Sequence, residues 1–444
     1  MNLTVALTVN TTPETDTETK PASIAVEGDP FSIEWQKCLG GSDDDGASSV
    51  WPTVDGGYII AGYTSSTNGD VVRSHGSGDA WVVKLDLDGE IEWQRCLGGS
   101  ANDLAWNVRQ TTDGGYIVAG ETSSTDGDVT GNHGKWDAWM VKLDPEGETE
   151  WQRFLGGSEN DGAYSVWQTD EGGYVFSGYT YSCNGDVSSN HGWGDAWVVK
   201  LDPEGEIEWQ RSLGGSDYDG ASSIQQGGDR EYIVTGYTKS TGGDVTGNHG
   251  GYDAWAVKLD PDGEIAWQRC LGGSGDDRAW GVGQMPDGGY AVAGYTESTD
   301  GDAIGNHGGD DAWVVKLDPE GAIEWQRCLG GSGMDRAYSI QSISDGEWIV
   351  AGYTYSTDGD VAGNHGGYDA WVVKLESTTL VASASVDMDL TAWVQDFDTW
   401  SVSEVQGKPY LFWFPPILPP LPQHLIQGDH TISLPAFHIR TSRA

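Results

Sequence analysis

The sequence predicts an all-β fold, a six-bladed β-propeller whose blades are four-stranded antiparallel sheets. A motif that first reads WQKCLGGS occurs six times, at a constant spacing of 58 residues. A fixed period of that length is typical of a repeat architecture, in which each unit packs only on its neighbours. Each period also holds four short segments rich in Val, Ile, Tyr, Trp and Thr, and none has helical spacing over three turns. The copies begin at Trp35, Trp93, Trp151, Trp209, Trp267 and Trp325.

The four strands of the unit can be assigned in the first complete copy, and we name them A to D in chain order. Strand A is predicted at Ala47–Thr53, B at Tyr58–Thr64, C at Ala80–Leu85 and D at Ile91–Leu97. Gly and Asp bound each run, and the A–B and C–D connections are tight turns of the DGG and DPEG kind. By analogy with other propeller repeats, A lines the central channel and D is outermost. An open β-solenoid is the alternative, although its coils are usually shorter and contain no hairpin meander.

The two ends of the repeat array are predicted to complete one blade together. A strand of type D stands alone at Ile33–Leu39, and the last copy ends after its strand C at Ala370–Leu375. The N-terminal strand would become the outer strand of the sixth blade and close the ring. We therefore expect a flexible lead-in over 1–30, the propeller over 31–376, and a Pro-rich C-terminal tail over 377–444.

The charge balance excludes whole classes of partner. The chain has 69 acidic and 23 basic residues, for a formal net charge of -46. Such a surface repels nucleic acid and anionic lipid, and it favours cations, basic partners or uncharged polymers such as glycans. No apolar run approaches the length of a membrane helix, so no membrane span is expected. Residues 1–12 hold a short apolar run without a basic flank, which is not a convincing signal peptide.

The recurring Cys and Trp positions are expected to serve packing. Four cysteines share one repeat position, where Phe154 and Ser212 stand in the other copies, and neither a disulfide nor a metal would tolerate that exchange. These cysteines are Cys38, Cys96, Cys270 and Cys328. The Trp residues of WQ and of DAW recur at strand centres, and we expect them to pack blade against blade.

The unit LGGSxxDxAxSV, DGGYIVAGYTxS, DAWVVKLDPxGEIEWQ resembles the β-propeller repeats of bacterial and archaeal surface proteins, including the type known as SBBP repeats. It is also similar to methanogen cell-surface proteins. The resemblance covers residues 31–376 and implies an extracellular or cell-surface module. It offers no shared catalytic set to carry over, because a fold does not fix a function.

Function is expected on one face of the ring, which we call the long-loop face. The B–C loops and the D-to-A crossovers are long and polar and meet there, while the A–B and C–D hairpins lie on the other face. One Asp recurs in every B–C loop: Asp70, Asp128, Asp186, Asp244, Asp302 and Asp360. Each copy adds one Asp in the crossover, first Asp45, and one before strand C, first Asp79, and the three are expected to converge near one rim.

These aspartates can be interpreted in two ways. A calcium site per blade would use carboxylates and loop carbonyls as a hard cation requires, so calcium is the cofactor that the sequence suggests. Alternatively, the Asp side chains cap backbone donors in the turns, which recurrence in every copy favours. Each B–C loop also carries one His, first His75. A zinc or copper ring of these histidines would need several ligands within about 2.3 Å of the metal, so we expect them to stabilise the loops.

Aromatic residues on the same face are the candidate ligand-binding residues. The residue after the strand-A Ala reads Ser, Trp, Tyr twice, so a three-blade unit is predicted to have been duplicated. These side chains could stack on sugar rings near the channel mouth, or they could pack around a tapering channel. With the loop aromatics, the candidates are Trp106, Tyr164, Trp280, Tyr338, Trp136, Trp193, Tyr252 and Tyr368.

The function expected from the sequence is a monomeric propeller at the cell surface or outside the cell that binds or adheres to glycans or surface proteins through the long-loop face. A hydrolase or lyase acting on polysaccharide, or a structural spacer of an envelope, are the alternatives. No blade departs from the repeat with an acid, base or nucleophile cluster, so no catalytic residue is predicted and the chain is not expected to be an enzyme.

Overall fold

The computed structural model describes residues 35–344, 347–376, 400–405 and 408–412. The lead-in expected over 1–30 and most of the tail lie outside the described residues. The chain divides into two compact units, Met1–Ser377 and Thr378–Ala444, and each is considered by itself. The described part of the second unit is one antiparallel hairpin of β24 (Trp400–Val405) and β25 (Lys408–Phe412).

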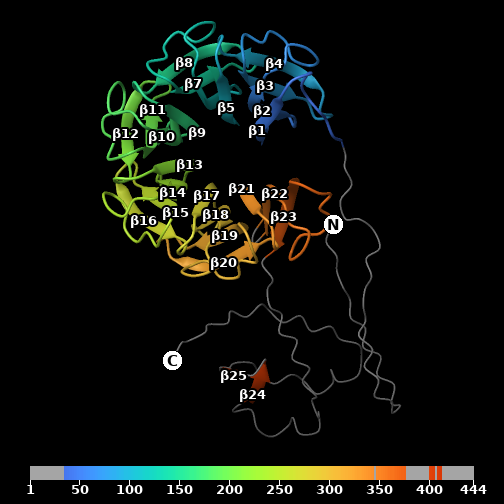
Figure 1. The fold of residues 1–444 in the computed structure, drawn as a ribbon, viewed down its shortest axis with the longest axis vertical. Coiled ribbons are helices and arrows are strands. Elements are labelled where there is room, and N and C mark those ends of the chain that lie inside the picture. The colour runs from blue at the N-terminus through green and yellow to red at the C-terminus, as the bar shows by residue number, and fades with distance from the viewer. Residues whose placement is uncertain (1–34, 345–346, 377–399, 406–407, 413–444) are drawn as a thin grey trace, which may run out of the picture. The chain divides into compact units, whose positions relative to one another are not determined.

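The first unit is a six-bladed β-propeller, as the sequence predicts, and the strands of each blade follow one another in the sheet (Figure 1). The blades are β1 (Asp45–Pro52), β2 (Tyr58–Thr64), β3 (Asp79–Leu85) and β4 (Ile91–Leu97); β5 (Asp103–Gln110), β6 (Tyr116–Thr122), β7 (Asp137–Leu143) and β8 (Thr149–Leu155); β9 (Asp161–Gln168), β10 (Tyr174–Thr180), β11 (Asp195–Leu201) and β12 (Ile207–Leu213); β13 (Asp219–Gln226), β14 (Tyr232–Thr238), β15 (Asp253–Leu259) and β16 (Ile265–Leu271); β17 (Asp277–Gln284), β18 (Tyr290–Thr296), β19 (Asp311–Leu317) and β20 (Ile323–Leu329); and β21 (Asp335–Ser344), β22 (Glu347–Thr354) and β23 (Asp369–Glu376).

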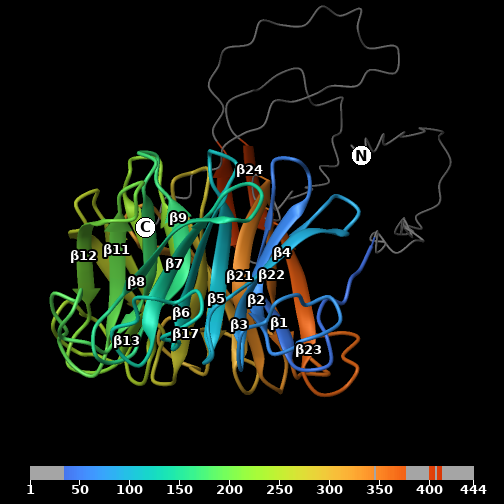
Figure 2. The same cartoon turned by 90° about the horizontal axis from the view of Figure 1, so that it is seen from above.

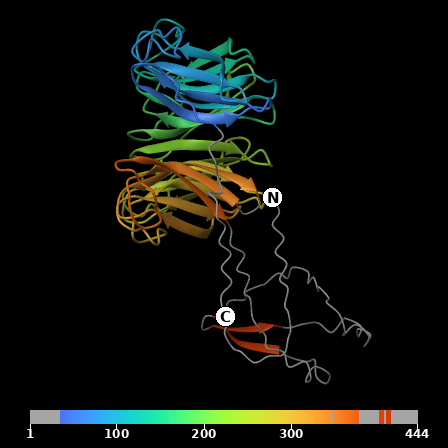
Figure 3. The ribbon, with the colours of Figure 1, turned by 90° about the vertical axis from the view of Figure 1, so that its right-hand side faces the viewer.

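The strand order places A innermost and D outermost. Figure 1 shows β1, β5, β9, β13, β17 and β21 around the centre, and Figures 2 and 3 show the loops gathered at the strand ends. Strand C lies between two strands of its own sheet and between two blades, so every residue of β3 and β7 is buried. The A–B hairpin turns as predicted at Gly56, whose φ of 91° suits glycine.

Every strand A contains a β-bulge, which the sequence analysis did not predict. In the first blade Ala47 pairs with Gly62 and Ser49 pairs with Ala61, so Ser48 is the extra residue. A glycine of strand B faces each bulge. A Cβ on Gly178 would lie 1.9 Å from the carbonyl oxygen of Gly162, so only glycine fits there.

The core consists of separate blade-to-blade clusters. In one of them Ile117 and Met140 of the second blade pack on Phe176 and Trp197 of the third. The predicted packing role of the tryptophans is confirmed: the DAW Trp is buried, and the WQ Trp meets an aromatic ring of the next blade, as Trp93 meets Tyr116 with centroids 5.5 Å apart. Cys96, Cys270 and Cys328 are buried free thiols, while Cys38 is exposed.

The predicted closing strand is not observed in the described residues. Trp35–Leu39 forms no strand, Ile33 and Glu34 lie outside the described residues, and the sheet of β21–β23 has three strands. Trp35 instead packs on Tyr58 of the first blade. The face of the first blade and the face of the sixth blade that would meet at the closing junction are therefore exposed. Val50 of the first blade is 60% exposed, whereas Val108 at the equivalent position of the second blade is fully buried. Val372 of the sixth blade is 61% exposed, whereas Val82 at the equivalent position of the first blade is fully buried.

Within the described part of the chain there is no helix long and apolar enough to cross a membrane.

Candidate functional site

The bulge of strand A determines where four of the predicted ligand-binding residues point. Trp106, Tyr164, Trp280 and Tyr338 are the extra residues of their strands, because the register shifts on either side of them. A bulge redirects a side chain away from the regular alternation of the strand, and bulges are frequent beside binding sites. In the first and fourth blades the same position holds Ser48 and Ser222.

The aromatic rings form two separate chains of contacts. The first runs through the second, third and fourth blades: Trp106, Tyr164, Tyr179, Tyr181, Tyr218 and Trp193, with neighbouring centroids 5.2 to 6.2 Å apart. The second runs through the last three blades: Tyr252, Tyr237, Trp280, Tyr338, Tyr353, Tyr368 and Tyr355, with centroids 5.0 to 6.3 Å apart. Both chains begin among half-buried rings and end in exposed ones, since Trp193 is 68% exposed and Tyr368 is 56% exposed.

Seven of the eight predicted residues belong to these chains. Trp136 is the exception: it is half-buried and contacts no other ring among the described residues. Six further members of these chains were not predicted from the sequence: Tyr179, Tyr237 and Tyr353 of strand B and the loop residues Tyr181, Tyr218 and Tyr355. The strand-B tyrosines belong to a GYT motif that recurs in five of the six copies, so the signal that could have found them was their repetition beside the variable bulge.

One strand-B position breaks the aromatic pattern with an acid. Glu121 replaces the tyrosine of AGYT in the second blade, and its side chain is buried beside the first aromatic chain. It accepts a hydrogen bond from the Tyr179 hydroxyl at 2.7 Å. The Trp106 indole N–H approaches the same carboxylate without reaching hydrogen-bond geometry. Burial raises the pKa of Glu121, against the smaller opposite effect of these two donors.

Two arginines distinguish the second chain from the first. Arg278 lies over the rings of Tyr237 and Tyr252, 4.8 and 4.2 Å from their centroids, and its buried Nε has no acceptor among the described residues. Arg336 lies 4.0 Å over the Tyr295 ring and forms an ion pair with Asp310. The long-loop face is therefore not six-fold uniform, because an acid accompanies one aromatic chain, while the two arginines and Lys239, 5.4 Å from the Tyr252 ring centroid, accompany the other.

Four of the six predicted metal ligands of the B–C loops accept backbone N–H groups with their carboxylates. Asp70 accepts from the Gly40 N–H at 3.1 Å, and Asp186 and Asp244 accept from Gly156 and Gly214 at 3.2 Å. These contacts are the backbone caps of the second interpretation. In the described ranges no group of three or more His, Cys, Asp or Glu side chains is placed to hold a metal ion. Calcium binding by the Asp70 series stays a prediction.

The three aspartates expected to converge near one rim lie close together but at two depths, since Asp103 and Asp128 accept the adjacent N–H groups of Gly99 and Gly98. The Asp before strand C and the Asp of the following crossover meet inside each junction, while the B–C loop Asp stays at the surface: Asp79 and Asp103 are fully buried, and the Asp128 side chain is 46% exposed. This difference in exposure follows from how the blades stack. The crossover passes under the loop of the preceding blade, where the Asp103 N–H donates to the Gly78 carbonyl at 2.8 Å.

The loop histidines have the stabilising role that the sequence suggested. His191 Nδ1 lies 2.6 Å from Asp195 Oδ2, and the backbone N–H of His191 donates to the same oxygen at 2.9 Å. The arrangement recurs at His133, His249 and His307. Each imidazole is thus held to its own loop through one ring nitrogen.

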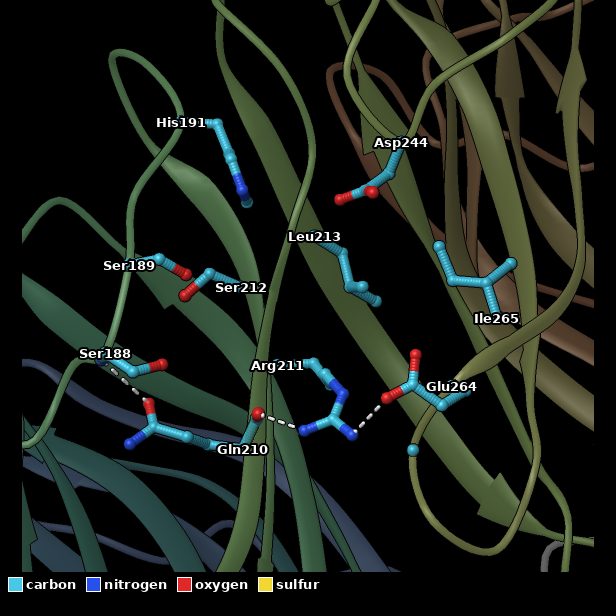
Figure 4. Close-up of a pocket in the computed structure, with 11 residues that line it drawn as sticks. Ser188, Ser189, His191, Gln210, Arg211, Ser212, Leu213, Asp244, Glu264 and Ile265 are labelled. Atoms are coloured by element: carbon cyan, nitrogen blue, oxygen red, sulfur yellow. Dashed lines mark hydrogen bonds and ion pairs between the residues drawn. The ribbon is translucent and has the colours of Figure 1, made fainter.

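A polar groove of about 280 Å³ lies between the third and fourth blades (Figure 4). Ser188, Ser189 and His191 come from one B–C loop, Ser212 from β12 and Asp244 from the next loop. In Figure 4 the His191 ring is directed toward Ser212. The lower end is formed by the ion pair of Arg211 with Glu264, 2.7 Å long.

The groove exists because Ser212 is small. At the preceding junction Phe154 occupies the equivalent position, and its ring would lie 2.6 Å from a Cβ on Gly131. The groove brings three serine hydroxyls and an imidazole together, which suits a hydroxyl-rich ligand. In this groove the Ser188 N–H donates to Gln210 at 3.3 Å, and His191 is held by Asp195.

Comparison with known proteins assigns no family to this chain. No family model matches the chain. Over 269 residues it is 25% identical to the regulatory protein FlaEY of Caulobacter vibrioides. The match covers 55% of this chain and 28% of FlaEY, so the chain spans little more than a quarter of that relative.

Solved structures with similarity include a protein of unknown function from Bacteroides caccae, at 15% identity over 66% of this chain and 85% of that one, with a TM-score of 0.37. They also include the Pan2 WD40 domain of Neurospora crassa, at 11% identity over 69% and 72%, with a TM-score of 0.42. A third is the PQQ-bound aldose sugar dehydrogenase of Streptomyces coelicolor, at 12% identity over 74% and 93%, with a TM-score of 0.36.

Proposed function

We propose that this chain is a binding or adhesion module of the cell surface or the extracellular space, and that it binds carbohydrate through the two aromatic chains of its long-loop face. The observation that carries the proposal is the bulge of strand A. In four of six blades it presents a Trp or Tyr, and from there ring contacts lead to exposed loop residues such as Trp193 and Tyr368.

Sugar chemistry suits such a surface. A pyranose presents C–H groups on its flat face and hydroxyls around its edge, so an exposed aromatic ring covers the first while polar loops bind the second. The side chains of Trp193 and Tyr368 are more than half exposed, and each touches a second ring, which holds it in place before a ligand arrives. Rings already held in place lose little conformational entropy on binding.

The net charge of -46 favours a neutral glycan over an acidic one. A surface protein is the other ligand class that exposed Tyr and Trp side chains suit, because both are enriched at protein interfaces. We favour the glycan as the ligand, because the exposed rings form two extended chains rather than one compact apolar patch, and an extended polymer can contact such chains along its length.

The test is binding of the whole chain to a panel of immobilised neutral and acidic polysaccharides. Trp193→Ala and Tyr368→Ala should each weaken binding about tenfold, which corresponds to ~1.4 kcal/mol. Trp136→Ala is the matched control: it is an aromatic residue of the same loop set that contacts no ring of either chain. Absence of binding to every glycan, or an equal loss in the control, would contradict the proposal.

A further inference from the structure

Each of the five described blade junctions buries two aspartates against each other. One precedes strand C and the other begins the strand A of the next blade, and none of the ten is more than 2% exposed. The pairs are Asp79 with Asp103, Asp137 with Asp161, Asp195 with Asp219, Asp253 with Asp277, and Asp311 with Asp335. Backbone hydrogen bonds fix the pairing: the N–H of Asp161 donates to the carbonyl of Trp136, the residue before Asp137, at 2.8 Å.

The donors around each pair leave at least one carboxylate oxygen without a partner. In the fourth junction Asp253 Oδ2 receives the His249 N–H and faces His249 Nδ1 at 2.7 Å, while Asp277 Oδ2 receives the Gly273 N–H and the Ser298 hydroxyl. Oδ1 of Asp253 has no hydrogen-bond partner, and the same atom is unpartnered in Asp79, Asp137, Asp195 and Asp311. A buried carboxylate oxygen without a donor is costly, so its repetition in five junctions requires an explanation.

In the fifth junction both carboxylates approach the same glycine. A Cβ built on Gly330 would lie 2.5 Å from Asp335 Oδ2 and 3.1 Å from Asp311 Oδ1, so both oxygens flank the same glycine. Two adjacent buried carboxylates repel each other when both are ionised, and one proton removes that repulsion. It also supplies the missing donor, because the protonated oxygen can donate to the lone pairs of the other aspartate.

We propose that each of these five aspartate pairs is a proton-binding site, in which the Asp before strand C carries the proton in mildly acidic solution and donates it to the Asp of the next crossover. The site is built into the repeat and is separate from the glycan surface. Its ligand is a proton rather than a metal ion, because each pair offers two carboxylates where calcium takes six to eight oxygen ligands.

The groups that face the pair in the fourth junction support this assignment. Burial raises the pKa of Asp253 to about 6, the His249 donors lower it, and Asp277 adds to the rise. Cys270 of β16 lies nearby, and burial raises its pKa to about 12, with Asp253 and Asp219 contributing. In this junction Asp277 Oδ1 also lacks a donor, so two oxygens are available to share the proton.

The open ends of the array provide an internal comparison. Asp369 corresponds to Asp253, but no crossover Asp faces it among the described residues; its side chain is 26% exposed, and its pKa is lowered, chiefly by the His365 backbone N–H. Asp45 corresponds to Asp277, and in the described part of the chain no Asp from a preceding strand C faces it. Burial raises its pKa, yet hydrogen bonds from Thr64, Gly41 and Ser66 leave it lowered overall. The elevation seen for Asp253 therefore accompanies pairing inside a junction.

The effect on stability has a definite sign. An unfolded Asp has a pKa of about 3.9, and that of folded Asp253 is about 6. A raised folded-state pKa contributes stability that is complete below pH ~4 and is lost as the pH rises through about 6. Asp253→Asn should thus melt about 2 °C above the parent at pH 7.5 and match it at pH 4.5.

The direct test is infrared detection of the protonated carboxyl group in the whole chain at pH 5, where an ordinary Asp is ionised. We expect a C=O band of the acid form that decreases in Asp253→Asn and decreases further when all five Asp residues before strand C in the paired junctions are replaced by Asn, leaving the contribution of buried acids outside the pairs such as Glu121. Asp186→Asn, at a loop carboxylate outside the pairs, should leave the band intact. Absence of the band at pH 5, or a band that the five replacements leave unchanged, overturns the proposal. It is also overturned if melting depends on calcium and a chelator while staying independent of pH, since a metal ion would then occupy the pair.

Discussion

Trp35 packs edge-on against Tyr58 with ring centroids 5.5 Å apart, the same contact that Trp93 makes with Tyr116 one blade later. Lys37 repeats the relationship by pairing with Glu90 at 2.5 Å, as Arg95 does with Glu148. The segment at Trp35–Leu39 thus lies against the first blade as a strand D of a preceding blade would. The blade that it would complete is the sixth, whose β23 pairs only with β22 among the described strands.

The register of that closure can be predicted from the other five blades. In each of them the DAW Trp pairs with the residue at the repeat's Cys position, as Trp81 does with Cys96. Trp371 should therefore pair with Cys38. In a Cys183→Ser background, Trp371→Cys should form an intramolecular disulfide with Cys38 under mild oxidation, detected as faster migration on a non-reducing gel. Val372→Cys is the control, because adjacent strand residues point to opposite faces. Disulfide-linked dimers, or no disulfide, would exclude closure within one chain.

Removing residues 31–40 should destabilise the whole propeller rather than fray one end. Trp35 and Leu39 belong to the hydrophobic cluster of the first blade, together with Tyr58 and Val83. Their loss uncovers that cluster and removes the partner of β23, so we expect the melting temperature to fall by several degrees in a single transition. Removing residues 1–30 alone is the control. An unchanged melting temperature after the longer deletion would show that the segment is dispensable.

Strand boundaries were accessible from sequence because they depend on local pattern. Strands B and D were predicted at the bounds observed for β2 and β4, and strand A was predicted two residues late, at Ala47 rather than Asp45. The bulge at Ser48 could not be predicted, because it exists only relative to the pairing of β2. The buried pair of Asp79 and Asp103 was missed for a related reason: the two residues belong to different blades, and a repeat pattern does not reveal which side chains meet across a junction.

The glycine opposite the bulge should tolerate no side chain. Gly178→Ala would place a Cβ 1.9 Å from the Gly162 carbonyl oxygen, and only a backbone shift of β9 or β10 could relieve the overlap. We expect a loss of about 3 kcal/mol or more in the free energy of unfolding, measured by denaturant titration. Gly228→Ala is the matched control in the neighbouring blade, because a Cβ there meets no atom within 4 Å. Equal losses of stability in the two variants would show that the bulge does not require glycine at position 178.

Calcium removal should leave the propeller's melting temperature unchanged. The carboxylates of the Asp70 series already accept backbone N–H groups, as Asp186 does from Gly156. Melts with added calcium and with a chelator measure this directly. Asp186→Asn should lower stability by about 0.5–1 kcal/mol through the weakened cap, independently of calcium. A chelator-dependent fall in the parent that is absent in Asp186→Asn would instead establish the calcium site.

The groove between the third and fourth blades can be closed by copying the preceding junction. Ser212→Phe alone should lower the stability of the propeller. Phe154 fits its own site only because Gly131 lies beside it, where a Cβ would be 2.6 Å from the ring. In the groove the residue equivalent to Gly131 is Ser189, which has a Cβ. Adding Ser189→Gly should recover at least 1 kcal/mol, an interaction energy that a double-mutant cycle measures by denaturant titration. The double variant should also stack the new ring on Trp197, as Phe154 stacks on Trp139 with centroids 5.9 Å apart. Additive effects of the two substitutions would mean that the groove is not shaped by this pair of positions.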